Sequence, residues 1–331
     1  MEPMLLKPVG KDYLWGGSRL RDEYNKDCPQ IPLAETWECS VHPDGPSKIA
    51  NGIDKGKTLD KVLHEHPEYL GTKVTGGLQN AGNIRIAGEL PILVKFIDAE
   101  KDLSVQVHPC DEYARTYEHQ NGKTEMWYVL DAKPGATLVC GFAFDMTPEI
   151  LKAAVATGTL DKHLQKVSVH KGDVFYIPAG TIHAIGAGAL IAEIQESSNV
   201  TYRVYDYDRI DKNGQRRPLH FDKAIEVLDM KAGADVRQKP RKVNYYYGCA
   251  REVLCRCKYF EIERVVVSLG FSFTVMLTSF QVLLCVSGSG GITSEDRHKP
   301  LRFKKGDCIF LPAGLGRCYV LGNCEMLKIR C

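Results

Sequence analysis

The chain contains the same nine-residue pattern twice, and this repeat limits the folds open to it. The pattern G-D-x-x-x-x-P-A-G occurs at residues 172–180 and again at residues 306–314, an offset of 134 positions. A hydrophobic stretch precedes each copy, beginning at Glu125 in the first and at Phe280 in the second, and each stretch runs to a glycine ten residues later. A duplication of this kind predicts two structurally similar units.

Each unit has the composition of short β-strands joined by tight turns. Runs of Val, Ile, Phe and Tyr, such as residues 167–170 and 174–177, alternate with Gly, Pro and Asp. Strands at this spacing predict a jelly-roll barrel, whose interior can hold a metal or a ligand. We therefore expect a mainly β fold of two jelly-roll barrels with inserted helices. Residues 1–230 would form a catalytic barrel, and residues 231–331 a second barrel without metal ligands.

Three segments interrupt the β pattern. They begin at Thr58, Asp111 and Thr147, and in each a helix-start residue is followed by helix-forming residues. The third has a proline at its first helical position and is predicted to extend to about Gln165. We expect these helices at the rim of the barrel, and residues 230–245 as the connection into the second barrel.

Charge and cysteine content exclude several classes of protein. The 331 residues include 43 Lys and Arg against 41 Asp and Glu, a net charge of +2 that gives no general attraction for nucleic acid or an anionic membrane. Twelve scattered cysteines indicate reduced thiols rather than a disulfide framework. The N-terminus lacks an apolar signal region, and no stretch approaches the ~18 apolar residues of a membrane span. We expect a cytoplasmic protein that captures any anionic ligand with local charges.

Polar side chains on one strand predict a metal site. In residues 103–109, Ser104, Gln106 and His108 alternate onto the same face, which would be costly inside a barrel unless they bind something. Together with Glu125 and His183, the amide, carboxylate and imidazole groups form a mixed N/O set suited to one Zn²⁺. A single buried histidine is more often structural. The second unit, however, has Arg317 in place of His183 and Phe280 in place of Glu125, so the scaffold is retained where the ligands are lost.

Three cations lie where they could bind an anion. Arg203 follows a polar turn and could hold a planar oxyanion with two parallel hydrogen bonds, or form an ordinary surface ion pair. Lys95 and Lys123 interrupt apolar strands. Such lysines usually extend to solvent, but inside a barrel they would contact a phosphate or an enediolate.

These motifs resemble a known family over nearly the whole chain. The turn that ends in His183 resembles the second cupin motif, so the fold expected is a pair of cupin-like barrels. Residues 103–109, 122–125, 180–184 and 202–203, with Trp15-Gly-Gly and residues 35–47, resemble the type I mannose-6-phosphate isomerases. The 58 positions between Glu125 and His183 leave no room for a large helical domain, as in the short bacterial forms.

The resemblance implies both ligands and chemistry. It implies that Gln106, His108, Glu125 and His183 bind zinc, and that Arg203, Glu193, Lys123, Ser104 and Lys95 handle a sugar phosphate. The implied reaction interconverts mannose 6-phosphate and fructose 6-phosphate by proton transfer between C1 and C2 through an enediolate. Arg203 would stabilise the developing negative charge. Glu193 or a metal-bound water would be the base.

Two other functions use the same residues. A cupin oxygenase would hold ferrous iron with two histidines and one carboxylate, and His108, His183 and Glu125 provide that set. A fourth candidate ligand, Gln106, argues against the oxygenase. A sugar-sensing cupin would bind a sugar phosphate without turnover. The isomerase is the function we favour. The sequence patterns leave the oligomeric state open, and they leave the native metal open among zinc, cobalt and manganese, since a mixed N/O site accepts each.

Overall fold

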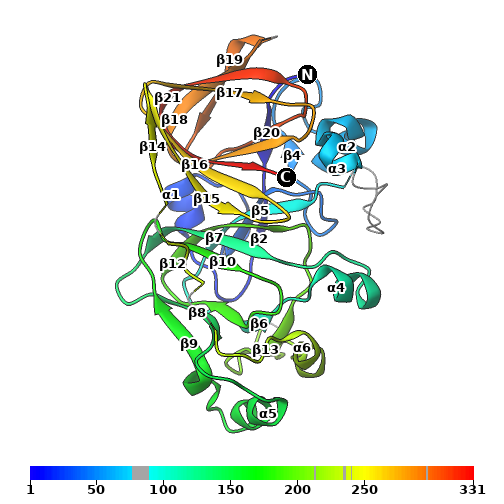
Figure 1. The fold of residues 1–331 in the computed structure, drawn as a ribbon, viewed down its shortest axis with the longest axis vertical. Coiled ribbons are helices and arrows are strands. Elements are labelled where there is room, and N and C mark those ends of the chain that lie inside the picture. Colours follow the sequence, from blue (N-terminus) through cyan, green and yellow to red (C-terminus); the bar gives the residue numbers. More distant parts are fainter. Residues whose placement is uncertain (77–88, 212–213, 234–235, 240, 296) are drawn as a thin grey trace.

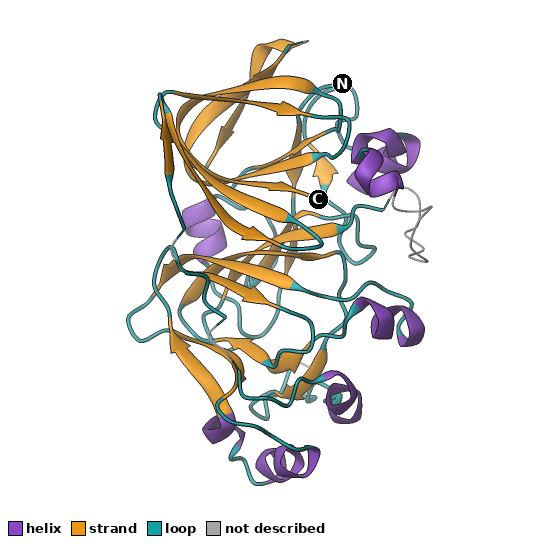
Figure 2. Ribbon diagram, viewed as in Figure 1, coloured by secondary structure: helices purple, strands orange, loops and turns teal. Residues whose placement is uncertain are grey.

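The computed structural model describes residues 1–76, 89–211, 214–233, 236–239, 241–295 and 297–331. Two β-barrels lie one against the other, and most helices lie outside them (Figures 1 and 2). The predicted mainly β fold of two cupin-like barrels is confirmed. None of the helices in these ranges is long and apolar enough to cross a membrane.

The first barrel is built from two antiparallel sheets. The six-stranded sheet has the order β10-β7-β12-β5-β3-β2, with bounds Val174–Ile177, Glu125–Ala132, Ala189–Glu196, Ile92–Asp98, Glu35–Cys39 and Val9–Lys11. The five-stranded sheet has the order β13-β6-β11-β8-β9, with bounds Tyr202–Tyr205, Val105–Val107, His183–Ile185, Thr137–Phe142 and Leu164–Ser168. One hydrophobic core, which includes Trp127 and Ile191 from the first sheet and Leu138 and Ile185 from the second, fills the space between them.

The second barrel is one ten-stranded sheet. Its path is β14-β15-β16-β21-β18-β20-β1-β4, with bounds Asn244–Tyr246, Cys249–Arg256, Glu261–Val267, Gly316–Arg330, Gln281–Ser294, Cys308–Leu311, Met4–Lys7 and Lys48–Ile49. Strand β17 (Gly270–Val275) pairs with β21, and β19 (Arg297–Lys304) pairs with β18. Because Met4 in β1 pairs with Phe310 in β20, the N-terminal residues add strands to this barrel. The division at residue 230 stays a prediction.

One face of the six-stranded sheet packs against the second barrel, and the other face lines the interior of the first barrel. Phe96, Met126 and Ile194 point outward into a core shared with Leu254 and Phe310 of the second barrel. Side chains alternate along a strand, so the neighbours of these three residues point into the first barrel. Their neighbours include Lys95, Glu125 and Glu193, which are buried polar groups.

The helices lie at α1 (Arg19–Tyr24), α2 (Leu59–Glu65), α3 (Thr72–Gly76), α4 (Asp111–Tyr117), α5 (Pro148–Ala156) and α6 (Phe221–Val227), with short 3-10 turns η1 (Pro67–Leu70) and η2 (Leu160–His163). Helices were expected where α2, α4 and α5 lie. The predicted extension of α5 to Gln165 is wrong. Gly158 adopts a left-handed φ of 66° just after the helix, and strand β9 has begun by Leu164.

Strand pairing also corrects the alignment of the two units. Ile177 in β10 pairs with Glu125, and the equivalent Leu311 in β20 pairs with Gln281. The counterpart of Glu125 is therefore Gln281 rather than Phe280. The inference that the second unit lacks this carboxylate is unchanged.

Candidate metal centre and adjoining cavity

Three buried side chains converge inside the first barrel. Ligand atoms of His108, Glu125 and His183 all lie within 4.8 Å of one another. His108 Nε2 is 3.2 Å from Glu125 Oε1 and 3.2 Å from His183 Nε2, and His183 Nε2 is 3.9 Å from Glu125 Oε2. Glu125 begins β7, His183 begins β11 and His108 follows β6, so strand ends from both sheets build the cluster.

Backbone carbonyls fix which nitrogen of each histidine faces the cluster. His108 Nδ1 donates to the Val200 carbonyl at 2.8 Å, and His183 Nδ1 donates to the Thr181 carbonyl at 2.9 Å. Each Nε2 therefore keeps a lone pair, as metal-binding histidines require. Burial and the charge of Lys123 lower the pKa of His108 to about 3, and burial also lowers the pKa of His183. Both rings are neutral at physiological pH.

A positively charged side chain, that of Lys123, contacts the cluster. The Lys123 ammonium donates to His108 Nε2 at 2.9 Å and to the Glu125 carboxylate. Burial acts to raise the pKa of Glu125, but Lys123 and His108 hold it well below its usual range. Two neutral imidazoles and one carboxylate thus lie around the Lys123 ammonium. The same three groups are a donor set that fits a divalent metal ion.

Gln106 reaches the same centre from the middle of β6. Its backbone pairs with His183 on one side and Arg203 on the other. Its amide nitrogen lies 3.4 Å from His183 Nε2, and its amide oxygen accepts a hydrogen bond from the Ser104 hydroxyl at 3.3 Å. A half-turn of the amide would present the oxygen to the centre, since the two ends have nearly the same shape.

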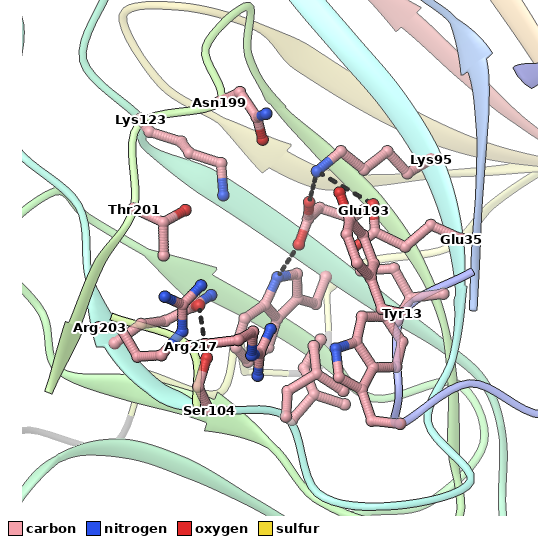
Figure 3. Close-up of a pocket in the computed structure, with 16 residues that line it drawn as sticks. Tyr13, Glu35, Lys95, Ser104, Lys123, Glu193, Asn199, Thr201, Arg203 and Arg217 are labelled. Atoms are coloured by element: carbon pink, nitrogen blue, oxygen red, sulfur yellow. Dashed lines mark hydrogen bonds and ion pairs between the residues drawn. The ribbon is translucent and has the colours of Figure 1, made fainter. Parts of the chain in front are cut away.

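A cavity of about 250 Å³ opens beside the cluster. Figure 3 shows the residues that line it. Lys123, Gln106 and Trp127 line this cavity and also contact the cluster. Its charged lining consists of four cations and two acids, namely Lys95, Lys123, Arg203, Arg217, Glu35 and Glu193. The excess of positive charge suits an anionic ligand.

One wall of the cavity is a network of buried charges on the six-stranded sheet. Glu193 in β12 lies directly opposite Lys95 in β5, and their charged atoms are 3.2 Å apart. The Trp127 indole donates to Glu193 at 2.9 Å and to Glu125 at 3.0 Å, so it joins this wall to the metal-site candidates. Burial and the charge of Glu125 raise the pKa of Glu193. Lys95 also lies 3.7 Å from Glu35, so it is less available to a phosphate than the sequence suggested.

The opposite wall carries two arginines. Arg203 in β13 donates to the Pro218 carbonyl at 2.8 Å, and burial with the nearby charge of Arg217 lowers its pKa. Arg217 is held by Asp206, to which its Nε donates at 2.7 Å. Figure 3 shows both arginines in the part of the cavity lining that includes Ser104, and the charge of Arg217 acts on Arg203. Two arginines in one wall form a natural site for an oxyanion.

All nine residues singled out from the sequence lie at the cluster or line the cavity: Lys95, Ser104, Gln106, His108, Lys123, Glu125, His183, Glu193 and Arg203. Their individual roles stay predictions. The residues of the cavity lining that the sequence did not identify include Arg217 and Tyr13. Arg217 lies outside any helix or strand, so no hydrophobic pattern marks it. Its side chain is positioned by Asp206, eleven residues earlier. Glu35 begins the segment 35–47 that resembles the isomerase family, but no feature of the sequence marked it as a cavity residue.

Comparisons with known proteins agree in both halves of the chain. The family model for the catalytic domain of type I phosphomannose isomerase matches residues 4–143, and the model for the cupin domain of mannose-6-phosphate isomerase matches residues 251–331. Mannose-6-phosphate isomerase ManA of Bacillus subtilis is 37% identical over 331 residues, covering 98% of each chain. Mannose-6-phosphate isomerase of Streptococcus mutans is 37% identical over 327 residues, covering 98% of this chain and 97% of that one.

A solved structure agrees as well. The crystal structure of the mannose 6-phosphate isomerase from Bacillus subtilis superimposes with a TM-score of 0.88 at 34% sequence identity. The match covers 99% of this chain and 99% of that one, so it includes both barrels and the connection between them.

Proposed function

We infer that this chain, which belongs to the type I phosphomannose isomerase family, interconverts mannose 6-phosphate and fructose 6-phosphate. The observation that carries this function is the buried His108, Glu125 and His183 cluster beside a cavity whose lining has an excess of positive charge. The reaction moves one proton between C1 and C2 of the open-chain sugar, so the site needs a base and a means of holding negative charge on oxygen.

We propose that Gln106, His108, Glu125 and His183 bind one Zn²⁺ per chain. The fixed Nε2 lone pairs, the anionic carboxylate and the reachable amide oxygen support this set. The chemistry supplied by a divalent ion here is polarisation of the sugar carbonyl. Lys123 would then turn away from the ligands, and its ammonium, which already lines the cavity, would reach the substrate.

The two walls suggest a division of tasks for the rest of the substrate. We propose that Arg217 and Arg203 hold the negatively charged oxygens, because both guanidinium groups line the cavity. Arg203 would stabilise the enediolate and Arg217 the phosphate. Ser104 and Lys95 remain the proposed contacts to the sugar, with Lys95 acting mainly through its ion pair with Glu193.

Glu193 is the proposed base. Its carboxylate lines the cavity, Trp127 fixes one oxygen, and burial raises its pKa toward that of a useful proton acceptor. The Lys95 ammonium beside it opposes that increase, because it favours the charged carboxylate.

We propose a cytoplasmic location for this activity, because the twelve scattered cysteines of the sequence indicate reduced thiols rather than a disulfide framework.

The test is an assay of fructose 6-phosphate formation by the purified chain, before and after treatment with a chelator. We expect activity to be lost with the metal, restored by Zn²⁺ and unaffected by removal of oxygen. Turnover that consumes oxygen would indicate the oxygenase, and sugar-phosphate binding without product would indicate the sensor.

A matched pair of variants isolates the metal site. His183→Gln removes one proposed ligand, whereas His170→Gln makes the same change on a side chain that is 78% exposed. We expect the first to lose bound metal and activity and the second to keep both. Equal behaviour of the two variants would contradict the proposed site.

A further inference from the structure

Two tryptophans of the six-stranded sheet each follow a glutamate at the same spacing. The sequence E-x-W occurs at residues 35–37 in β3 and at residues 125–127 in β7. Because side chains alternate along a strand, each tryptophan lies on the same face as its glutamate. Trp37 donates from Nε1 to Glu35 at 2.8 Å, and Trp127 donates from Nε1 to Glu125 at 3.0 Å. Both indole rings are buried, at 0% and 1% exposed.

The Trp127 indole also reaches a second carboxylate. Its Nε1 donates to Glu193 Oε2 at 2.9 Å, because Glu193 in β12 lies directly opposite Trp127. Trp37 lies opposite Lys95 instead, so the neighbouring strand places a cation beside that indole. One N–H is therefore shared between the candidate metal ligand Glu125 and the proposed base Glu193.

The shared N–H takes one oxygen of each acid, Oε2 of Glu125 and Oε2 of Glu193. The other oxygen of Glu125, Oε1, remains on the side of the cluster, where it lies 3.2 Å from His108 Nε2. The other oxygen of Glu193, Oε1, lies 3.2 Å from the Lys95 ammonium (Figure 3). It accepts no hydrogen bond within the part of the chain that the structure describes. Each acid thus keeps one oxygen for its proposed task.

The ring of Trp127 also packs against another candidate ligand. It meets the His183 imidazole edge to face, with ring centres 5.5 Å apart and an angle of 71° between the ring planes. The Thr181 carbonyl holds the same imidazole at Nδ1, at 2.9 Å. One side chain therefore contacts two of the candidate ligands and the proposed base.

The shared donor matters because both carboxylates are buried. Glu125 is 0% exposed and Glu193 is 3% exposed. Two negative charges taken out of water repel each other, and each needs hydrogen bonds in place of those that water would supply. An indole N–H is a donor only, and here it serves both acids. A tryptophan that only filled the core would not need its N–H aimed at two carboxylates.

We infer that Trp127 is a positioning residue, which uses one hydrogen-bond donor to orient Glu125 toward the metal and Glu193 toward the substrate. The inference rests on the proposed function, because it takes both acids in the roles given there. Removal of a group that orients a metal ligand typically lowers metal affinity about 10- to 100-fold. A hydrogen bond to a charged group corresponds to a similar factor of about 10- to 100-fold in rate. Loss of the N–H should therefore reduce both zinc affinity and turnover.

Replacement by phenylalanine removes the N–H and keeps an aromatic ring in the core. Trp127→Phe should weaken zinc binding about 10- to 100-fold, measured on the metal-free protein by competition with a chromophoric chelator. At saturating zinc, its kcat for mannose 6-phosphate should fall about 10- to 100-fold. KM should change little, because the arginines of the opposite wall are left in place.

Trp37→Phe is the matched control. It removes the same kind of N–H from an equally buried ring, but Glu35 is not a member of the metal-site cluster. We expect it to keep the parental zinc affinity and a kcat close to the parental value. Equal losses in the two variants would show a general effect of packing, and parental values for Trp127→Phe would overturn the inference. A parent protein that binds zinc without isomerising the sugar would contradict the proposed function alone, because the comparison of zinc affinities still tests Trp127.

A spectroscopic test needs no change at Trp127. The chain has three tryptophans, at positions 15, 37 and 127, so its indole ¹⁵N spectrum contains three N–H peaks. Trp15→Phe and Trp37→Phe each remove one peak and so assign all three. Addition of zinc should shift the Trp127 peak, because a bound cation withdraws charge from the carboxylate that this N–H contacts, and should leave the Trp37 peak in place. A Trp127 peak that zinc does not move would contradict the inference.

Discussion

Arg217 offers the sharpest test of how the cavity binds an anion, because the chain supplies its own control. Arg217 and Arg209 both donate hydrogen bonds to the same carboxylate, that of Asp206. Their side chains are 22% and 16% exposed, so the two sites are similar in burial. Only Arg217 lines the cavity. The pair therefore separates a loss of stability from a loss of substrate contact.

The magnitude follows from the lost contact. A hydrogen bond between charged groups contributes about 1.5–3 kcal/mol, and each 1.4 kcal/mol is about a factor of ten in affinity. Arg217→Ala should raise KM for mannose 6-phosphate about 10- to 100-fold, with a smaller change in kcat. Each variant leaves Asp206 with one arginine, so both should lose about 1–3 kcal/mol of stability.

The assay is steady-state kinetics of both variants in parallel with urea unfolding. Arg209→Ala should keep the parental KM while losing a similar amount of stability. Equal increases of KM in both variants would show that the effect comes through Asp206. No increase with Arg217→Ala would show that this guanidinium does not contact the phosphate.

Three further outcomes are expected. Arg203→Ala should lower kcat by about 10²-fold with the metal still bound, and unchanged turnover would remove Arg203 from the mechanism. Glu125→Gln should lower the metal content measured by atomic absorption, because the centre loses its only carboxylate among the three buried ligands; full occupancy would contradict the ligand set. Burial and the nearby Asp111 raise the pKa of Glu196 to about 8, so the stability it contributes is complete below its ordinary 4.5 and is lost as the pH rises toward 8. Glu196→Gln should flatten that decline between pH 5 and pH 8 in urea unfolding, and an unaltered decline would show that another group causes it.

The architecture could be predicted because the repeat and the period-two alternation are local signals. They gave two barrels, and they placed Gln106 and His108 on one strand face. The end of α5 was missed because a glycine in a left-handed conformation stops the helix at a point where the composition still favours it.

The site could be predicted only in part, because its finer arrangement depends on contacts between distant strands. That Trp127 would join Glu125 to Glu193 follows from the pairing of β7 with β12 rather than from any motif. That Lys123 would reach His108 Nε2 depends on another contact between distant residues, in which the Lys123 N–H donates to the Pro109 carbonyl at 3.1 Å. The pairing of Lys95 with Glu193 and Glu35 is likewise a property of the assembled sheet. Sequence spacing therefore identified which groups meet, but not which of them neutralise one another.

The central claim is that one divalent metal ion sits among His108, Glu125 and His183 with Gln106 completing the set. An anomalous-scattering map from crystals of the zinc-loaded protein tests this most directly. We predict one strong peak within coordinating distance of both Nε2 atoms, the Glu125 carboxylate and the Gln106 amide oxygen. A map with no peak there, or with its peak elsewhere in the barrel, would contradict the account.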